Sequence, residues 1–285
     1  MSDFFVKIRP GENGAQLNKH IVLFLVKNEK RDLILYEKLL FLQGGFSFQN
    51  TSGNMNNIVT RTFGVDFIYF DIFFLVCWIV FLVYKKYYTA IRWGLAGWII
   101  YIFIDYLLWF RIMGSRHYSG PIDTELFFAW FCFSPGFVQF SYVIVMFEKR
   151  SVREAVFWTL FFYCGWTAVG LLSQWIPLDD TLLRAARDMG KGNQRLIMGG
   201  LALANFIIGI IMVFYHKIKW KDLLYLFLVG TLVEFALEFS LLVSGIRLEQ
   251  GQWSMGMMLV NSLIEFNCGI IMMYIIWRFL FGKKW

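Results

Sequence analysis

Charged residues are scarce in this sequence. Only 16% of its 285 residues are Asp, Glu, Lys or Arg, whereas 58% are hydrophobic. A soluble domain needs more polar surface than this composition supplies. Apolar stretches of about 20 residues recur along the chain, and each is long enough to cross the hydrocarbon core of a bilayer. The composition therefore predicts a polytopic α-helical membrane protein.

Residues that bind metals and cofactors are also few. The three histidines lie outside the cores of the apolar stretches, which argues against paired-histidine haem ligation and tri-histidine zinc sites. The four cysteines lie inside these stretches without a pairing pattern, and we interpret them as packing residues. The last stretch lacks a lysine for a retinal Schiff base, and the sequence has no G-x-G-x-x-G, Walker or G-x-S-x-G motif. We expect no metal and no cofactor.

Seven transmembrane helices are predicted, which makes the expected fold class all-α. Their ranges are 65–84, 92–113, 126–147, 154–176, 196–216, 222–246 and 256–280. Basic residues gather in every second connection and at the C-terminus, and they include Lys85, Lys86, Lys149, Arg150, Lys217, Lys219, Lys283 and Lys284. The positive-inside rule then places the C-terminus in the cytoplasm and the start of the first helix outside. We expect a multi-pass protein of the cell membrane, and we interpret the net charge of +7 as an orientation signal rather than as a nucleic-acid-binding feature.

Residues 1–60 are predicted to be a separate, non-spanning N-terminal segment ahead of a transmembrane domain at 61–285. Their two apolar patches, "HIVLFLV" and "LILYEKLLFL", are each too short to span a bilayer. Either the working chain begins at Met55, or the segment is a small cytoplasmic or interfacial part. The second alternative would conflict with the orientation given above.

The first three and the last three predicted helices resemble each other in sequence. Four features recur in the same order: "VYKK" (83–86) and "FYHK" (214–217), Gly97 with Asp105 and Gly230 with Glu238, "GSR" (114–116) and "GIR" (245–247), and "QFS" (139–141) and "EFN" (265–267). Both sets begin on the same side of the membrane. The pattern predicts a parallel 3+1+3 repeat with a pseudo-two-fold axis along the membrane normal, where transporter sites form.

Carboxylates occur inside the apolar stretches at similar depths. Asp105 and Glu238 lie eight residues below the outer ends of their helices and Glu265 lies nine below, which is roughly 12–14 Å, while Asp71 lies slightly higher. A carboxylate at such a depth costs at least about 2.5 kcal/mol and indicates a functional site. We therefore expect one polar pocket in the outer half of the bundle. The alternative is that each acid is neutral and hydrogen-bonded to a neighbouring helix.

Helical spacing adds further residues to this pocket. Glu234 and Glu238 are one turn apart and share a helix face, and Asn261 and Glu265 repeat that separation. Neighbouring carboxylates can donate and accept protons. We predict Asp105, Glu238 and Glu265 as catalytic residues. The predicted substrate-binding residues are Asp71, Arg116, Gln139, Glu234, Arg247, Asn261 and Asn267. We interpret Arg116 and Arg247 as interface anchors, or alternatively as groups that bind an anionic head or pair with the acids.

A resemblance connects two of these acids with a known family. Asp105 in "WIIYIFIDYLLW" and Glu265 in "IEFNCGIIMMYIIWRF" are similar to the functional acids on helix 2 and on the last helix of the seven-helix integral-membrane terpene cyclases of meroterpenoid pathways. That family commonly has Glu in the first position and Asp in the second. The resemblance covers under a third of the chain. It implies an enzyme that protonates an olefin or epoxide of a membrane-dissolved isoprenoid.

Two other functions stay open at this point. The 3+1+3 plan is also similar to that of sugar-transporting seven-helix proteins and trimeric cation channels, which implies a transporter for a small cationic or polar solute. The chain lacks the Pro-Gln pair of the sugar transporters. A third alternative is an interaction subunit whose acids face outward toward a partner. We expect membrane lipids and either a hydrophobic substrate or such a solute as partners, and no nucleic acid.

Overall fold

The computed structural model describes residues 58–148, 151–176, 178–179, 181–188, 194–249 and 255–281. The predictions for residues 1–54, including a start at Met55, lie outside this part of the chain. The compact unit that carries the described elements comprises Asn54–Trp285. Its first strand, β1, begins at Ile58, so the predicted boundary at residue 60 falls within a strand.

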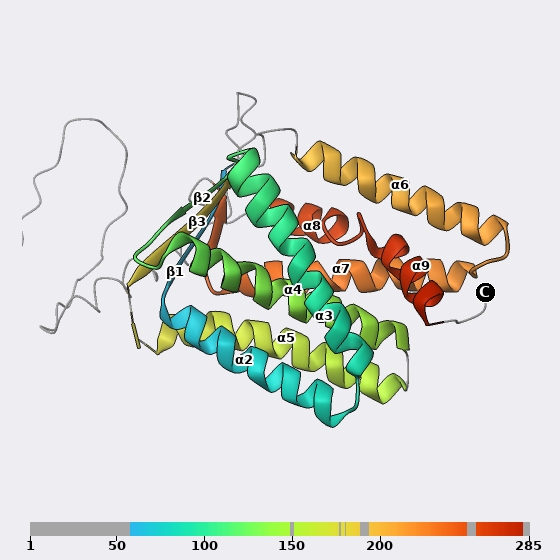
Figure 1. The fold of residues 1–285 in the computed structure, drawn as a ribbon, viewed down its shortest axis with the longest axis horizontal. Coiled ribbons are helices and arrows are strands. Elements are labelled where there is room, and N and C mark those ends of the chain that lie inside the picture. The colour runs from blue at the N-terminus through green and yellow to red at the C-terminus, as the bar shows by residue number, and fades with distance from the viewer. Residues whose placement is uncertain are drawn as a thin grey trace, which may run out of the picture. The chain divides into compact units, whose positions relative to one another are not determined.

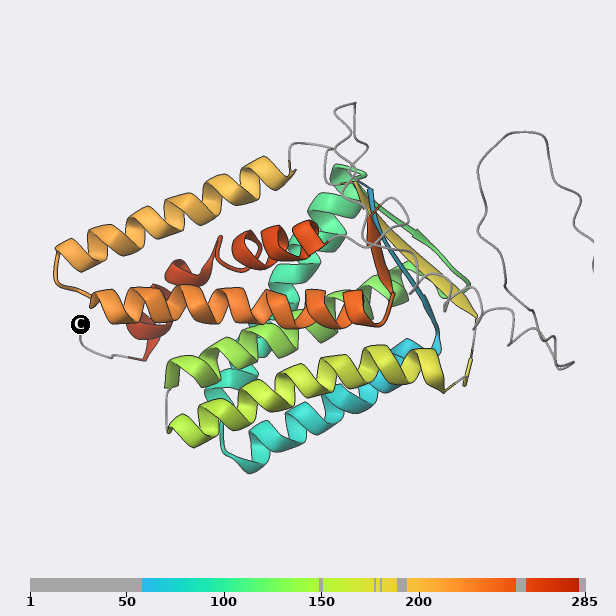
Figure 2. The ribbon, with the colours of Figure 1, turned by 180° about the vertical axis from the view of Figure 1, so that it is seen from behind.

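Six helices in the described part of the chain are long and apolar enough to cross a membrane. They are α2 (Asp66–Tyr84), α3 (Tyr88–Tyr101) continued by the π-helix η1 (Ile102–Ile112), α4 (Thr124–Glu148), α5 (Val152–Trp175), α6 (Gln194–Phe214) and α7 (Trp220–Val243). Their ends lie within a few residues of the predicted ends, because the apolar runs themselves set the helix lengths. The helices lie side by side in a bundle (Figures 1 and 2).

The predicted seventh helix, 256–280, is not continuous. The structure instead has two short helices, α8 (Met255–Ile264) and α9 (Ile270–Leu280), joined by a turn. The turn contains the polar triplet "EFN" and Gly269. Asn267 and Gly269 disfavour helix, which apolar composition alone does not reveal, so the prediction of a continuous seventh helix was wrong.

A four-stranded antiparallel sheet corrects the all-α expectation. It consists of β1 (Ile58–Gly64), β2 (Arg116–Ser119), β3 (Leu182–Asp188) and β4 (Arg247–Glu249), in the order β2-β3-β1-β4. The sheet lies at one end of the helix bundle (Figure 1). Its strands are short and carry several charges, so the sequence analysis assigned them to loops. Only alternate residues of a strand face the bundle, which gives a weaker signal than a helix does.

The two halves of the unit have the same order of elements. β1, α2, α3–η1, β2 and α4 are followed, after α5, by β3, α6, α7, β4 and α8–α9. Exchanging β1 with β3 and β2 with β4 leaves the strand order of the sheet unchanged.

The turns of the two halves also match. Lys86 and His216 both have positive φ, 60° and 54°, after the first helix of each half, and Gly114 and Gly245 have φ of 55° and 71° before β2 and β4. The resemblance between the halves thus extends from sequence to backbone.

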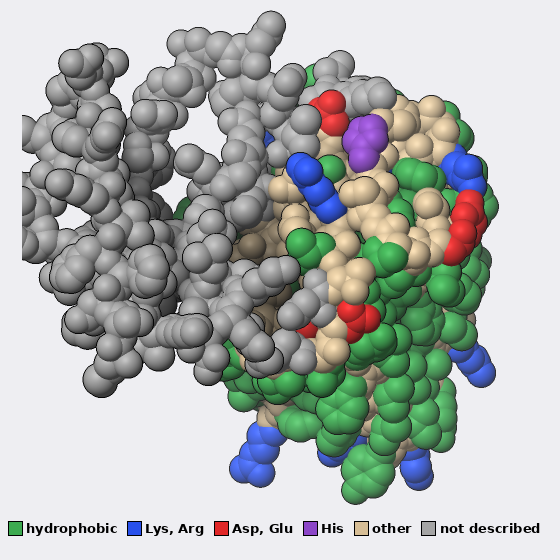
Figure 3. Space-filling view, turned by 90° about the vertical axis from the view of Figure 1, so that its left-hand side faces the viewer, with side chains coloured by type: hydrophobic (Ala, Val, Ile, Leu, Met, Phe, Trp, Pro, Cys, Tyr) green, Lys and Arg blue, Asp and Glu red, His purple; other side chains and the backbone are tan. Residues whose placement is uncertain are grey.

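Packing inside the first half is close at one helix pair. A Cβ atom on Gly97 of α3 would lie 2.3 Å from the carbonyl oxygen of Gly136 on α4, so both glycines let the backbones approach. The outer surface of the bundle is different. Many large hydrophobic side chains are exposed there, such as Phe73 of α2 and Phe214 of α6. Figure 3 shows a broad apolar flank on the part of this surface that it displays. Such a surface is suited to contact with lipid.

Candidate functional site

Four arginines, one from each strand, lie on the same face of the sheet. Arg116 of β2 is opposite Arg187 of β3, and Arg61 of β1 is opposite Arg247 of β4. Arg61 is also opposite Ala185, which is two residues from Arg187 and therefore on the same face. Arg116, Arg187 and Arg247 are buried between the sheet and the helices.

Only two of these arginines were predicted from the sequence. Arg116 and Arg247 were found because each ends a repeated Gly-x-Arg motif. Arg61 and Arg187 were missed, since nothing distinguishes a single arginine in a segment that is assigned to a loop. The strand alternation of "LLRAARD", in which Arg187 shares a face with Leu183 and Ala185, was the available signal.

Three of the four arginines form ion pairs with the predicted catalytic carboxylates. Arg116 Nη2 lies 2.5 Å from Asp105 Oδ1, and Arg187 Nη1 lies 3.2 Å from Glu265 Oε1. Arg247 pairs with Glu238. The interpretation of Arg116 and Arg247 as snorkelling interface anchors is therefore wrong, because both side chains point into the protein and contact the predicted acids.

Burial changes the acidity of these guanidinium groups. It lowers the pKa of Arg247 to about 9, because the charged form loses its hydration. It also lowers the pKa of Arg116 below its usual value, although the neighbouring Asp105 opposes this shift. With a pKa of about 9, the Arg247 guanidinium stays protonated at neutral pH.

Glu234 lies close to two of these carboxylates. Carboxylate oxygens of Glu234, Glu238 and Glu265 all lie within 4.8 Å of one another. Gln139 Nε2 of α4 donates to Glu234 Oε2 at 3.1 Å, and the hydroxyl of Tyr101 donates to Gln139 Oε1. Among the described residues, Glu234 forms no ion pair with an arginine, unlike its two neighbours. Three close carboxylates could hold a cation, but arginines already neutralise two of them, so the donor set does not favour a metal ion.

Two of the four acids lie where their helices are irregular, whereas Glu234 and Glu238 lie in the continuous helix α7. Asp105 is in the π-helix η1, and Glu265 is the first residue of the turn between α8 and α9. π-helical backbone is rare and is often found at functional sites, and broken membrane helices form transporter sites. The irregular segments therefore coincide with the cluster that we term the arginine–carboxylate cluster: Arg61, Asp105, Arg116, Arg187, Glu234, Glu238, Arg247 and Glu265.

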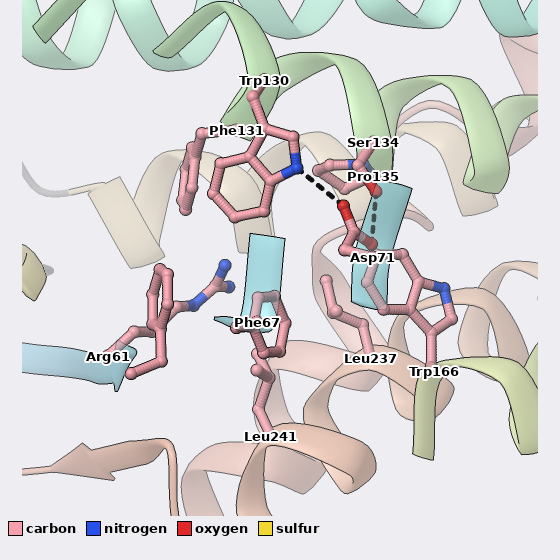
Figure 4. Close-up of a pocket in the computed structure, with 11 residues that line it drawn as sticks. Arg61, Phe67, Asp71, Trp130, Phe131, Ser134, Pro135, Trp166, Leu237 and Leu241 are labelled. Atoms are coloured by element: carbon pink, nitrogen blue, oxygen red, sulfur yellow. Dashed lines mark hydrogen bonds between the residues drawn. The ribbon is translucent and has the colours of Figure 1, made fainter. Parts of the chain in front are cut away.

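Asp71 lies outside that cluster. It accepts hydrogen bonds from Trp130 Nε1 and Ser134 Oγ, both at 2.8 Å. It lines a pocket of ≈ 30 Å³ whose walls include Trp130, Phe131 and Trp166. Arg61 points from β1 toward this pocket (Figure 4). A cavity of that size has room for about two water molecules.

The two predicted asparagines have different surroundings. Asn267 Nδ2 donates to Thr231 Oγ1 at 2.9 Å and to the carbonyl oxygen of Leu263 at 3.0 Å, so it ties the α8–α9 turn to α7. The side chain of Asn261 is fully buried on α8, and its amide has no hydrogen-bond partner in the described part of the chain. Of the predicted amide side chains, only Gln139 is thus seen to donate to a cluster carboxylate in the described part of the chain, that of Glu234. Asn267 instead contacts residues of α7 and α8.

No family model, curated protein or solved structure matches this chain.

Proposed function

We propose that this chain is a membrane-embedded enzyme that carries out acid/base chemistry on a hydrophobic, isoprenoid-like substrate. The observation that carries the proposal is the unequal pairing of three close carboxylates. Glu238 and Glu265 each have an arginine, whereas Glu234 has an amide hydrogen-bond donor. A carboxyl group without an ion pair is suited to hold a proton, and one paired with arginine is suited to stay ionised.

The proposed reaction uses these two kinds of carboxyl group together. Glu234 gives its proton to an olefin or epoxide of the substrate, and a neighbouring carboxylate, Glu238, takes a proton from an adjacent carbon. The substrate is then isomerised or cyclised without a net change of atoms. A positive charge that develops between the two steps is stabilised by aromatic faces.

The pocket beside the cluster supports a hydrophobic substrate. Trp130, Phe131 and Trp166 give it aromatic walls, and Leu237 and Leu241 line it from α7, the helix that carries Glu234 and Glu238. The inward position of the acids is also unlike that of an interaction subunit, which would present them to a partner. Asp105 belongs to the proposed machinery through its pair with Arg116.

The proposed placement in the membrane follows from the same elements. We take the halves as a parallel 3+1+3 repeat in which α8 and α9 together form the seventh span. The sheet then lies on the outer side, and the basic turns at Lys85 and Lys217 and the C-terminus lie in the cytoplasm. The apolar flank supports contact with the lipid of a cell membrane (Figure 3).

Deuterium incorporation tests the proposed chemistry without knowledge of the substrate. The wild-type protein would be purified in nanodiscs with its native lipids, incubated in D₂O, and its extracted lipids examined by high-resolution mass spectrometry. A carboxyl group exchanges its proton with solvent, so turnover should place carbon-bound deuterium in one lipid and raise its mass by about one unit.

The informative variant is Glu234→Gln, which is nearly isosteric and breaks no ion pair. We expect it to fold, as judged by gel filtration, and to lose the deuterium label. The matched control is Glu125→Gln, whose side chain is exposed and pairs with Arg111 at the surface. Labelling by folded Glu234→Gln at the wild-type rate, or no labelled lipid with the wild type, would overturn the proposal.

A proton- or cation-coupled transporter for a small solute is the second candidate. It is favoured by the discontinuous α8–α9 segment and by ion pairs on both halves of a duplicated fold, which are features of transporter sites. Proteoliposomes that contain a pH-sensitive dye would test it. Solute-dependent proton flux that is lost in Glu234→Gln, together with no labelled lipid in D₂O, would establish this function instead.

A further inference from the structure

The four arginines of the sheet are not equivalent, because Arg61 forms no ion pair among the described residues. Its charged group instead faces an aromatic ring. The Arg61 guanidinium carbon lies 5.5 Å from the centroid of Phe131, and that of Arg116 lies 5.4 Å from the same centroid. Arg116 has Asp105 as a partner in addition, whereas Arg61 has the ring alone.

The second half of the fold shows which partner Arg61 lacks. Arg187 occupies the corresponding place on β3 and pairs with Glu265 of the "EFN" triplet. The first half has "QFS" at the matching place, so an uncharged amide, Gln139, stands where the second half has an acid. The order of elements is the same in both halves, but the first half has no carboxylate at this position.

Asp71 is the one acid that lines the pocket toward which Arg61 points, and the two form no ion pair in the described part of the chain. The two carboxylate oxygens of Asp71 instead accept hydrogen bonds from Trp130 and Ser134 (Figure 4). The remaining walls are mainly aromatic and aliphatic. A cation in apolar surroundings without a partner is costly.

The surrounding charges also leave the Arg61 guanidinium incompletely compensated. Burial lowers the pKa of the Arg61 guanidinium, and the carboxylates of Glu234 and Glu265 only oppose this effect from a distance. In the proposed reaction Glu234 holds a proton before turnover, so it has no negative charge that could stabilise the Arg61 guanidinium. The cluster then contains one more cation than anion.

We propose that Arg61 binds the anionic head group, a phosphate or a carboxylate, of the lipid substrate, with the first carbons of the apolar tail against Trp130 and Phe131. The planar guanidinium group suits both oxyanions because it offers parallel N–H donors. The pocket of ≈ 30 Å³ is too small for the tail, so the rest of the tail lies along the apolar surface of the bundle. This inference rests on the proposed function in that it concerns the same substrate.

Four probes test the inference in a native mass spectrometry titration of the purified protein. Geranylgeranyl phosphate and palmitate each carry an anionic head, geranylgeraniol has a neutral one, and inorganic phosphate has no tail. Charge-assisted hydrogen bonds of the expected strength should make at least one anionic lipid bind about ten-fold more tightly than geranylgeraniol. Equal affinities would overturn the inference.

Arg61→Gln should remove that difference while leaving geranylgeraniol binding unchanged. It breaks no ion pair, so the variant should fold. The matched control is Arg184→Gln, which removes the same charge from an exposed side chain on the opposite face of the sheet. A preference for anionic lipids that survives in Arg61→Gln, or that disappears equally in Arg184→Gln, would contradict the assignment.

Inorganic phosphate distinguishes the two sources of the anion. If it displaces the lipid phosphate at millimolar concentration, the site binds a free oxyanion and the lipid part of the inference is wrong. The outcome is also separable from the proposed function. Arg61-dependent binding without deuterium labelling would leave the anion site standing and reject the enzyme, and labelling without anionic preference would do the reverse.

Discussion

In the first half of the fold, from β1 to α4, the polar cluster receives two arginines and one acid, Asp105. The second half, from β3 to α9, supplies two arginines and three acids, Glu234, Glu238 and Glu265. The strand order and the turns of the halves match. The charges are therefore distributed differently over a repeated backbone, and the cluster approaches neutrality only when the halves meet.

The contact between the halves illustrates this division. Gln139 of the first half donates to Glu234 of the second, and Tyr101 of the first half donates to Gln139. Where the halves are alike, as in Arg116–Asp105 and Arg247–Glu238, the residues hold the sheet to the helices. Where they differ, at Gln139 and Glu265, Arg187 has a carboxylate partner, whereas Arg61 forms no ion pair among the described residues. Arg61 and Glu234, to which we assign anion binding and proton donation, thus lie outside the shared pairs, whereas the proposed base, Glu238, belongs to one of them.

The largest expected effect comes from breaking the pairs that the halves share. Glu238→Ala leaves Arg247 buried without a partner, which should cost about 3–5 kcal/mol of unfolding free energy. Asp105→Ala should act in the same direction on the first half. The measurement is unfolding in detergent–SDS mixtures, followed by tryptophan fluorescence.

The control for this comparison is Glu125→Ala. Its pair with Arg111 is half-exposed and should contribute about 0–1 kcal/mol. If Glu238→Ala is as mild as Glu125→Ala, the buried pair is not formed. If only one of the two buried pairs matters, the halves are less alike than their backbones.

A smaller difference in stability is expected between alanine substitutions at two matching glycines, Gly97 and Gly230. In Gly97→Ala the new Cβ meets the Gly136 carbonyl oxygen at 2.3 Å, and backbone there cannot move aside easily, so we expect a loss of about 1–3 kcal/mol. In Gly230→Ala the Cβ meets Asn267 Oδ1 at 2.2 Å, which is the end of a side chain. The same unfolding assay should therefore give a smaller loss for Gly230→Ala. A larger loss there would show that Asn267 is fixed more rigidly than its contacts indicate.

The smallest expected loss of stability comes from substitutions at Gly114 and Gly245, and it should be the same in both halves. Gly245 has φ of 71°, and a Cβ there would meet nothing within 4 Å, so Gly245→Ala should cost only the backbone strain of about 1–2 kcal/mol. Gly245→Asn should recover part of it, because asparagine tolerates this conformation. Thermal melting, monitored by gel filtration, would compare it with Gly114→Ala. Opposite results in the two halves would argue against matching turns.

The sequence predicted the helices well and the site only in part. The long apolar runs set α2 to α7, and the repeated Gly-x-Arg and acidic positions led to Asp105, Glu238, Arg116 and Arg247. The acids carry this signal because a carboxylate in an apolar run is rare.

The rest depended on contacts between distant segments. Arg61 and Arg187 join the cluster only through strand pairing, and three- to seven-residue strands show little pattern of their own. The break at Glu265 was hidden because the residues on both sides are as apolar as a spanning helix. Asp71 was grouped with the other acids by depth alone, which does not reveal the direction in which a side chain points.

The central pair of the sheet joins β1 to β3, and this has a consequence for how the chain folds. β1 is synthesised before every described helix, yet its neighbour follows only after α2, α3–η1, α4 and α5. Pairings between such distant segments form slowly, because the entropy of closing a long loop is lost before the stabilising contacts form. The sheet should therefore form late, after the helices have been inserted. A nascent chain that is halted after α5 would contain four of the spanning helices but not β3, the strand with which β1 pairs.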